Sequence, residues 1–111
     1  MSGALNIFKT VTANVTTAPT NVYSTPLGYS SVVLMAQISN IDVANTIQIS
    51  AALDRAGNIT SLIQNADVPI TDAITVLTGR LIMTFGDSFQ VSASADDSAQ
   101  LTLSLLETLT G

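Results

Sequence analysis

The densest group of potentially reactive side chains lies in the stretch FGDSFQVSASADD, residues 85–97, which contains three aspartates and three serines. A serine nucleophile needs a base beside it, and the chain has no histidine to take that part. The single lysine, Lys9, is expected on the outer face of the first strand, away from any serine that it could activate. The sequence therefore excludes a Ser-His-Asp triad and disfavours a serine-lysine pair.

Carboxylates offer a second route to catalysis, through a pair that divides the acid and base roles. Asp96 and Asp97 are adjacent, so on a strand they would point to opposite faces, and in a turn both would be solvated. Glu107 is the only glutamate and has no partner that the sequence makes visible. Glycoside hydrolysis by two aspartates stays an alternative, but the pattern favours a protein without catalytic residues.

Metal and cofactor sites find little support in the composition. The absence of cysteine and histidine removes the usual ligands of zinc and copper. Seven aspartates could supply oxygen ligands to calcium, but the chain has no D-x-D-x-D-G loop, and aspartates also stabilise turns. No glycine-rich phosphate-binding motif occurs. We therefore expect no catalytic, cofactor-binding or metal-binding residues.

Charge and hydropathy limit the partners. The net charge is −5 and the three basic residues, Lys9, Arg55 and Arg80, are scattered, which disfavours binding to nucleic acid. The first residues lack a signal-peptide pattern and no run approaches about 18 apolar residues, so we expect a soluble protein made in the cytoplasm, without membrane contact. With 47% hydrophobic and 10% charged residues, the composition is typical of an assembly subunit and predicts a homo-oligomer.

Alternation of apolar and polar residues, the pattern of a half-buried strand, recurs along nearly the whole chain. It predicts strands near residues 5–15, 22–24, 30–39, 47–53, 59–64, 73–77, 80–85, 89–95 and 101–105. The segment from Val32 to Ala36 is apolar on both faces, which predicts a central strand covered by a second sheet or by a neighbouring subunit. For residues 98–109, the spacing of Leu101, Leu103 and Leu105 favours a strand over a helix.

The connections follow from the turn residues. The weak strand 59–64 is expected to end at NADVPITD, and AITVL and RLIMTF are expected to form a hairpin around Thr78 and Gly79. The inward residues of the next strands are expected to be Leu81, Met83 and Phe85, then Phe89, Val91, Ala93 and Ala95. Gly86 with Asp87, and Asp96 with Asp97, are expected to be turns on either side of the strand between them.

These elements predict an all-β fold, a single antiparallel β-sandwich or jelly roll of about eight short strands. At 111 residues the chain fits one domain, residues 1–111. Threonine and serine account for 27 residues, mostly on the polar strand faces. A neutral hydroxyl face suits contacts between subunits because no charge is buried there, although threonine also favours strands through its shape.

Three stretches carry motifs that can be compared with a known kind of protein: VYSTPLGYSSVVLMAQISNID, VLTGRLIMTFGDSFQVSASADD and LTLSLLET. The motif positions are Val22, Tyr23, Pro26, Gly28, Asn40, Asp42, Gly79, Leu81, Gly86, Asp87 and Ser92 to Ala95. Over roughly residues 20–108 the chain resembles small virion structural proteins of tailed bacteriophages, particularly cyanophages. The resemblance implies a β-sandwich and a virion setting, and brings no catalytic residues with it.

The function implied by the resemblance is that of a non-enzymatic virion protein, made in the cytoplasm of a bacterial host and packed on other virion proteins. Capsid decoration, with the major capsid protein as partner, is the expected role, and a neck, tail or baseplate accessory protein is the alternative. A second alternative is calcium-assisted binding of host-surface carbohydrate, with Tyr23 and Tyr29 as stacking platforms. Both tyrosines also fit a role in bracing the turn at Pro26 to Gly28.

Overall fold

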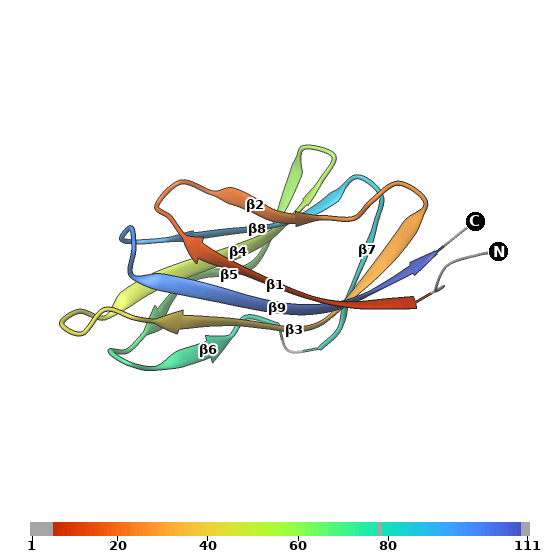
Figure 1. Cartoon of the computed structure of the whole chain (residues 1–111). Helices are drawn as coiled ribbons and strands as arrows, with labels where there is room; N and C mark the ends of the chain where they lie inside the picture. Colours follow the sequence, from red (N-terminus) through yellow and green to blue (C-terminus); the bar gives the residue numbers. More distant parts are fainter. Residues whose placement is uncertain (1–5, 78, 110–111) are drawn as a thin grey trace.

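A computed structural model describes residues 6–77 and 79–109, which form nine strands and no helix (Figure 1). The strands are β1 Asn6–Val15, β2 Thr20–Ser24, β3 Tyr29–Asn40, β4 Ile47–Arg55, β5 Asn58–Val68, β6 Ala73–Thr75, β7 Leu81–Thr84, β8 Asp87–Ala93 and β9 Ala99–Leu109. Each predicted strand has a counterpart among them. Leu5, expected on the inner face of the first strand, lies outside the described residues.

The strands form two antiparallel sheets. Sheet A has the order β1-β9-β3-β6, with β7 also paired to β3, and sheet B has the order β2-β8-β4-β5. The pairings are nested: β1 with β9, β2 with β8, β3 with β6 and β7, and β4 with β5. A long hairpin rolled up in this way, with its strands alternating between two sheets, is a jelly roll. The predicted fold class is confirmed.

The core lies between the sheets and is built from the alternating residues of both. Leu101, Leu103 and Leu105 of β9 face Phe89 and Val91 of β8, and all five are at most 1% exposed. Burying a side chain of this size contributes roughly 1.5–3 kcal/mol. The alternation that predicted these strands therefore reflects one face turned to the core.

The strand β3 is central in sheet A, as its apolar composition predicts. It pairs with β9 along one edge and with β6 and β7 along the other. Its inner face is covered by sheet B, with Val33, Ala36 and Ile38 fully buried. On its outer face Val32 is half-buried and Leu34, at a β-bulge, is 42% exposed. The second sheet thus accounts for one apolar face, and the other is left at the surface.

The expected hairpin around residues 78 and 79 is wrong. β6 pairs antiparallel with residues 37–39 of β3, and β7 pairs antiparallel with residues 30–33, so both run in the same direction along one edge. The reason is length: β3 has twelve residues and accommodates two short strands end to end. Thr78 itself lies outside the described residues.

Three further expectations need correction. β5 continues through NADV to Val68, because bulges in its pairing with β4 and a left-handed φ of 51° at Asn65 absorb the irregularity. Phe85 does not join Met83 in the core; it lies in the turn before β8 and is 63% exposed. Ala95 lies beyond the end of β8 in a bend. The strand at residues 99–109 is confirmed over the helical alternative.

Candidate functional site

Four polar side chains meet between the two sheets, near the end of the sandwich where β1 begins and β9 ends (Figure 1). The Tyr23 hydroxyl of β2 donates a hydrogen bond to Glu107 Oε2 of β9 at 2.6 Å, and it lies 2.6 Å from Ser31 Oγ of β3. Lys9 Nζ of β1 lies 3.1 Å from Glu107 Oε1. Tyr23 belongs to sheet B and the other three residues to sheet A. This group, the Glu107 cluster, therefore ties the two sheets together.

Burial sets the electrostatics of the Glu107 cluster. The Glu107 side chain is 3% exposed, so its charge depends on Lys9 and on the Tyr23 hydroxyl for compensation. Burial, and next the hydrogen bond to Glu107, raise the pKa of Tyr23 to about 12. The phenol is therefore protonated at neutral pH and remains a donor.

The Glu107 cluster is arranged for bridging rather than for nucleophilic attack. Lys9 is engaged by Glu107, and Ser31 is fully buried beside the Tyr23 hydroxyl, so the two do not form a serine-lysine pair. The expected outer-face position of Lys9 is wrong, because it is paired with Leu105 and shares the inner face. Glu107 does have partners, although its sequence neighbours do not reveal them.

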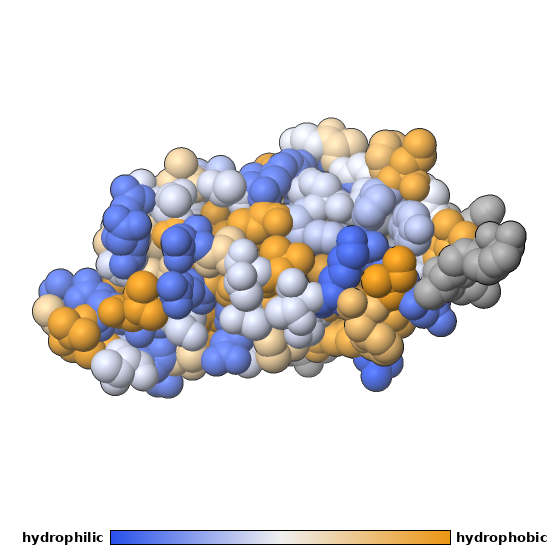
Figure 2. All heavy atoms as spheres, viewed as in Figure 1, coloured by the Kyte–Doolittle hydropathy of each residue, from blue (hydrophilic) through white to orange (hydrophobic). Residues whose placement is uncertain are grey.

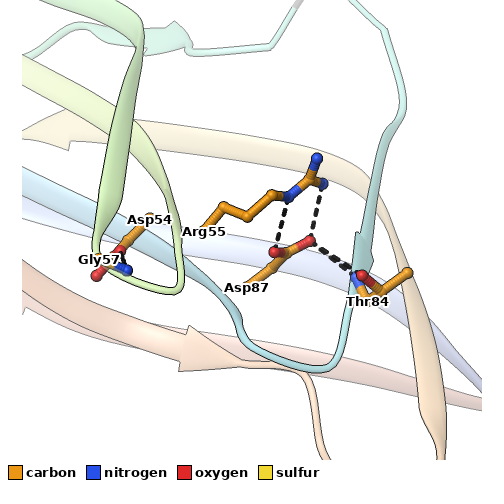
Figure 3. Close-up of polar contacts among 5 residues, drawn as sticks. All are labelled: Asp54, Arg55, Gly57, Thr84 and Asp87. Carbon is orange, nitrogen blue, oxygen red and sulfur yellow. Dashed lines mark hydrogen bonds and ion pairs between the residues drawn. The ribbon is translucent and has the colours of Figure 1, made fainter.

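A second buried acid, Asp87, begins β8 at the same end (Figure 3). It accepts two hydrogen bonds of 2.9 Å from the guanidinium of Arg55 and a third, also 2.9 Å, from the Thr84 backbone N–H. The bonds from Arg55, more than any other contact, hold the pKa of Asp87 below its usual range, against the opposing effect of burial. In the adjacent turn Gly57 N–H donates to Asp54 Oδ1 at 2.9 Å. Asp87 thus joins β4 to the turn between β7 and β8.

At the opposite end of the sandwich Asn40 is a buried polar residue that joins several elements. Its Nδ2 donates to the carbonyl oxygens of Val68, Asn45 and Pro69 at 2.9, 3.0 and 3.2 Å. Its Oδ1 accepts from the Asp42 N–H at 2.7 Å. A neutral amide therefore joins the ends of β3 and β5 to the loop that follows β3.

Asp42 organises that loop from the surface. Its Oδ1 accepts hydrogen bonds from the N–H groups of Ala44 and Asn45 at 2.8 and 3.1 Å. The bond from Ala44 is the main reason that the pKa of Asp42 lies below its usual range. Asn40 and Asp42 thus have structural roles in the geometry of this loop.

The stretch 85–97 divides into a turn, a strand and a turn, as its sequence predicts, but the first turn is formed by Phe85 and Gly86, and Asp87, expected in that turn, begins β8. The length of β8 separates Asp87 from Asp96 and Asp97, so the three aspartates do not form one site. Asp96 Oδ1 accepts a hydrogen bond from the Thr17 N–H at 2.8 Å, and Asp97 adopts a left-handed φ of 60° in the turn. Asp87 and Asp96 therefore bind partners that are distant in the sequence, and Asp97 takes part in the turn through its backbone.

The tyrosines have different environments. Tyr23 points into the Glu107 cluster, whereas Tyr29 closes the preceding turn with its backbone, donating its N–H to the Pro26 carbonyl at 3.1 Å. The expected bracing of this turn is thus provided by the main chain of Tyr29. Tyr23 therefore acts through its side chain inside the sandwich, whereas Tyr29 acts through its backbone in the turn.

The sequence analysis did not predict either ion pair, although the sequence does indicate the pair formed by Lys9 and Glu107. Lys9 interrupts the apolar face of the first strand, and Glu107 follows Leu105 in an apolar series, so each charge needed a buried partner. The pairing of Arg55 with Asp87 has no local signal, because the two residues meet only through the register of β4 and β8.

Metal and ligand sites were sought over the described part of the chain. Within residues 6–77 and 79–109, no three acidic side chains are grouped to hold a metal ion. The same residues include no helix with the length and apolar character needed to cross a membrane. A shallow hollow of about 440 Å³ lies over β1 and β9, lined by Thr12, Ala13, Asn14, Gln100, Leu101 and Thr102. Its lining carries no charged side chain.

The two ends of the sandwich differ in surface charge. The acidic end, formed by the turns 16–19, 41–46, 69–72 and 94–98, includes five aspartates: Asp42, Asp67, Asp72, Asp96 and Asp97. Over the remainder, three acids, Asp54, Asp87 and Glu107, balance three bases, Lys9, Arg55 and Arg80. The net side-chain charge of −5 therefore resides at the acidic end.

The other end, which we call the terminal end, exposes large apolar side chains. Those at least 40% exposed there are Phe8, Leu27, Ile59, Ile82, Phe85 and Leu109. Figure 2 shows hydrophobic residues reaching the visible surface at both ends, among neutral and polar ones. At the acidic end the corresponding side chains are Ile41, Val43 and Ile70. Apolar exposure without net charge is thus a property of the terminal end.

Neither a protein-family model nor a curated protein sequence matches this chain. Among solved structures, a chain of the cyanophage Pam1 capsid asymmetric unit is similar over 98% of this chain and 89% of that chain, with TM-score 0.51 and 16% identity. VP2 of the infectious bursal disease virus subviral particle is similar over 96% of this chain and 33% of that chain, with TM-score 0.53 and 10% identity. The nucleoplasmin-like N-terminal domain of Drosophila FKBP39 covers 100% and 98%, with TM-score 0.51 and 11% identity. These similarities show a shared fold, which viral capsid proteins and a non-viral domain both use.

Proposed function

We propose that this chain is a non-enzymatic structural protein of a bacteriophage virion that decorates the capsid by binding the head shell. The observation that carries the proposal is the outer face of sheet A, where the strand registers place no charged residue facing outward. Such a neutral face can be covered by another protein without the cost of burying charge. The proposal assigns no catalytic, cofactor-binding or metal-binding residue and places its synthesis in the cytoplasm of the bacterial host.

The fold similarity supports this setting. The cyanophage capsid chain matches nearly the whole length of both proteins, and VP2 adds a second viral particle protein. On a symmetric particle, many weak contacts of one small subunit add up to strong attachment, so a deep pocket is not needed. The proposed partners are the major capsid protein and other copies of this chain.

The test is the location of the chain in intact particles of the phage that encodes it. Electron microscopy with a gold-labelled affinity tag should place the label over the head surface. A label confined to the neck, tail or baseplate would support the accessory-protein alternative instead. Absence of the chain from gradient-purified particles, measured by mass spectrometry, would contradict both virion roles.

A carbohydrate-binding role is the second candidate, favoured by the hollow over β1 and β9. Its hydroxyl and amide side chains, such as Asn14 and Gln100, are suitable hydrogen-bonding partners for a sugar, although no aromatic ring is among its lining residues. Binding to a glycan array that Asn14→Ala and Gln100→Ala both weaken would support this role. Loss of that binding on chelation would add the calcium dependence.

A further inference from the structure

The outer face of sheet A carries a row of apolar side chains across four neighbouring strands. In the strand registers Phe8 is paired with Leu106, Leu106 with Val32, and Val32 with Ile82. Directly paired residues point to the same face of a sheet, so these four side chains form one continuous surface. With neighbouring strands about 4.8 Å apart, this apolar row is about 14 Å wide.

The apolar row is exposed on its two outer strands and half-buried at its centre, Leu106 and Val32, and the residues paired beside it are neutral. Phe8 is 76% exposed and Ile82 is 64% exposed, and Leu34 at the bulge of β3 extends the surface at 42%. The residues that flank the row on the same face are Thr10, Ser30, Thr84, Ser104 and Thr108. An apolar centre within a polar rim is the usual anatomy of a protein interface.

We propose that the apolar row binds a second copy of this chain across a two-fold axis, with the two acidic ends pointing in opposite directions. A two-fold axis through the row places each copy's row against the other, so one patch serves both partners. The proposal uses only exposure, register and charge. It assigns the apolar row to the second copy and leaves the rest of the outer face of sheet A, such as Thr12 and Thr102 nearer the acidic end, free to contact the head shell.

The charge distribution is the reason for choosing a second copy and this orientation. Two copies that each carry −5 repel most where their acidic ends approach, and those ends hold the whole net charge. The apolar row lies on the half of the molecule where acids and bases balance, so copies can meet there without bringing aspartates together. A side-by-side arrangement in the same direction would place ten aspartates next to one another at one end.

Sedimentation equilibrium of the full chain tests the surface. The wild type should form a dimer of about twice 11.5 kDa, and Phe8→Thr combined with Ile82→Thr should raise the dissociation constant at least about 30-fold, as expected for central interface residues. Val43→Thr makes the same kind of change at an 85% exposed position of the acidic end and should leave the constant within about 3-fold.

Several outcomes would overturn the proposal: a wild-type monomer at all concentrations up to about 1 mM, a closed trimer or larger ring, or a dimer weakened by Val43→Thr and not by the double substitution. Circular dichroism establishes that each variant keeps its strands. If the double variant unfolds, Ile82→Thr alone, at the edge of sheet A, supplies the same comparison. A wild-type monomer that binds purified head shells through Phe8 and Ile82 would assign the row to a shell protein and overturn the dimer.

The orientation is tested separately with spin labels, because the chain has no cysteine and accepts a single one cleanly. Val43→Cys places a label on the acidic end. The eight residue steps from Val32 to Asn40 span roughly 26 Å, so opposed acidic ends put the two labels more than about 45 Å apart. A label separation below about 30 Å would show copies aligned in the same direction and overturn the arrangement.

Discussion

At the terminal end of the sandwich the buried polar side chains include two carboxylates, Asp87 and Glu107, whereas at the acidic end they are neutral, and the amide of Asn40 joins the elements there. The charge on the surface of the two ends is distributed in the opposite way to the charge in their interiors. The terminal end exposes apolar side chains and no net charge, and the acidic end exposes five aspartates. The difference teaches that acids can be retained where contact is expected, provided that they are buried and paired with bases.

The largest expected loss of stability is for a substitution at the terminal end. Asp87→Ala removes the acceptor of two hydrogen bonds from Arg55 and one from the Thr84 N–H, and should lower the free energy of unfolding by about 3 kcal/mol. Urea unfolding measures the change. Asp67→Ala, an exposed aspartate of β5, is the control and should stay within about 0.5 kcal/mol. A loss below about 1 kcal/mol at Asp87 would remove the distinction between the two ends.

The corresponding substitution at the acidic end should lower the free energy of unfolding by somewhat less. Asn40→Ala leaves the carbonyls of Val68, Asn45 and Pro69 without this donor, and should cost about 2 kcal/mol in the same urea experiment. Asn45→Ala, whose side chain makes only a 3.5 Å contact with Asp42, should cost less than about 0.5 kcal/mol. If Asn40→Ala costs more than Asp87→Ala, the neutral amide is the stronger tie and the ranking of the ends is reversed.

Alkaline pH should act on the terminal end through Tyr23. Its pKa in the folded protein is about 12, against 10.0 for an ordinary tyrosine, so its contribution to stability is present below pH 10 and is lost as the pH rises to 12. The melting temperature of the wild type should therefore fall more steeply between pH 10 and 12 than that of Tyr23→Phe. Tyr29→Phe is the control and should retain the steep fall. Equal slopes in the wild type and Tyr23→Phe would contradict the role of this hydroxyl.

The smallest expected effect is a gain in stability at the acidic end. Thr71 adopts a left-handed φ of 60°, which is unfavourable for a β-branched residue, whereas three turns of the terminal end use Gly28, Gly57 and Gly86 at positive φ. Thr71→Gly should raise the free energy of unfolding by about 0.5 kcal/mol, since the relief of strain exceeds the added entropy of the unfolded chain. Thr75→Gly, within β6, should instead lower it by about 1 kcal/mol. A loss of stability in both variants would show that the turn carries no strain.

The sequence predicts most of the strands because their burial is a local property. β8 alternates from Phe89 to Ala93 and β9 from Leu101 to Leu105, since each strand has one face in the core, and the pattern identifies both strands and these inner residues. The arrangement around β3 could not be predicted in the same way. Its twelve residues accept β6 and β7 end to end, and this depends on the length of a strand that lies far away in the sequence.

The contacts of the buried polar side chains could not be predicted from the sequence either. Tyr23 and Glu107 are 84 residues apart, and Arg55 and Asp87 are 32 apart, so their contacts follow from strand order and register and not from spacing. Only the out-of-pattern positions of Lys9 and Glu107 could have indicated that a buried charge required a partner. The acidic side chains of the stretch 85–97 form no common site for the converse reason: although they are close in the sequence, the length of β8 separates Asp87 from Asp96 and Asp97.

The central claim, that this chain works as a virion subunit and makes contacts through its neutral surfaces, is tested most directly by a reconstruction of the intact phage particle by electron cryo-microscopy. The account predicts copies of the jelly roll on the head, with the outer face of sheet A or the terminal end covered by protein and the acidic end facing solvent. A particle without the chain, or one in which the acidic end is buried and the apolar row is open to solvent, would contradict it.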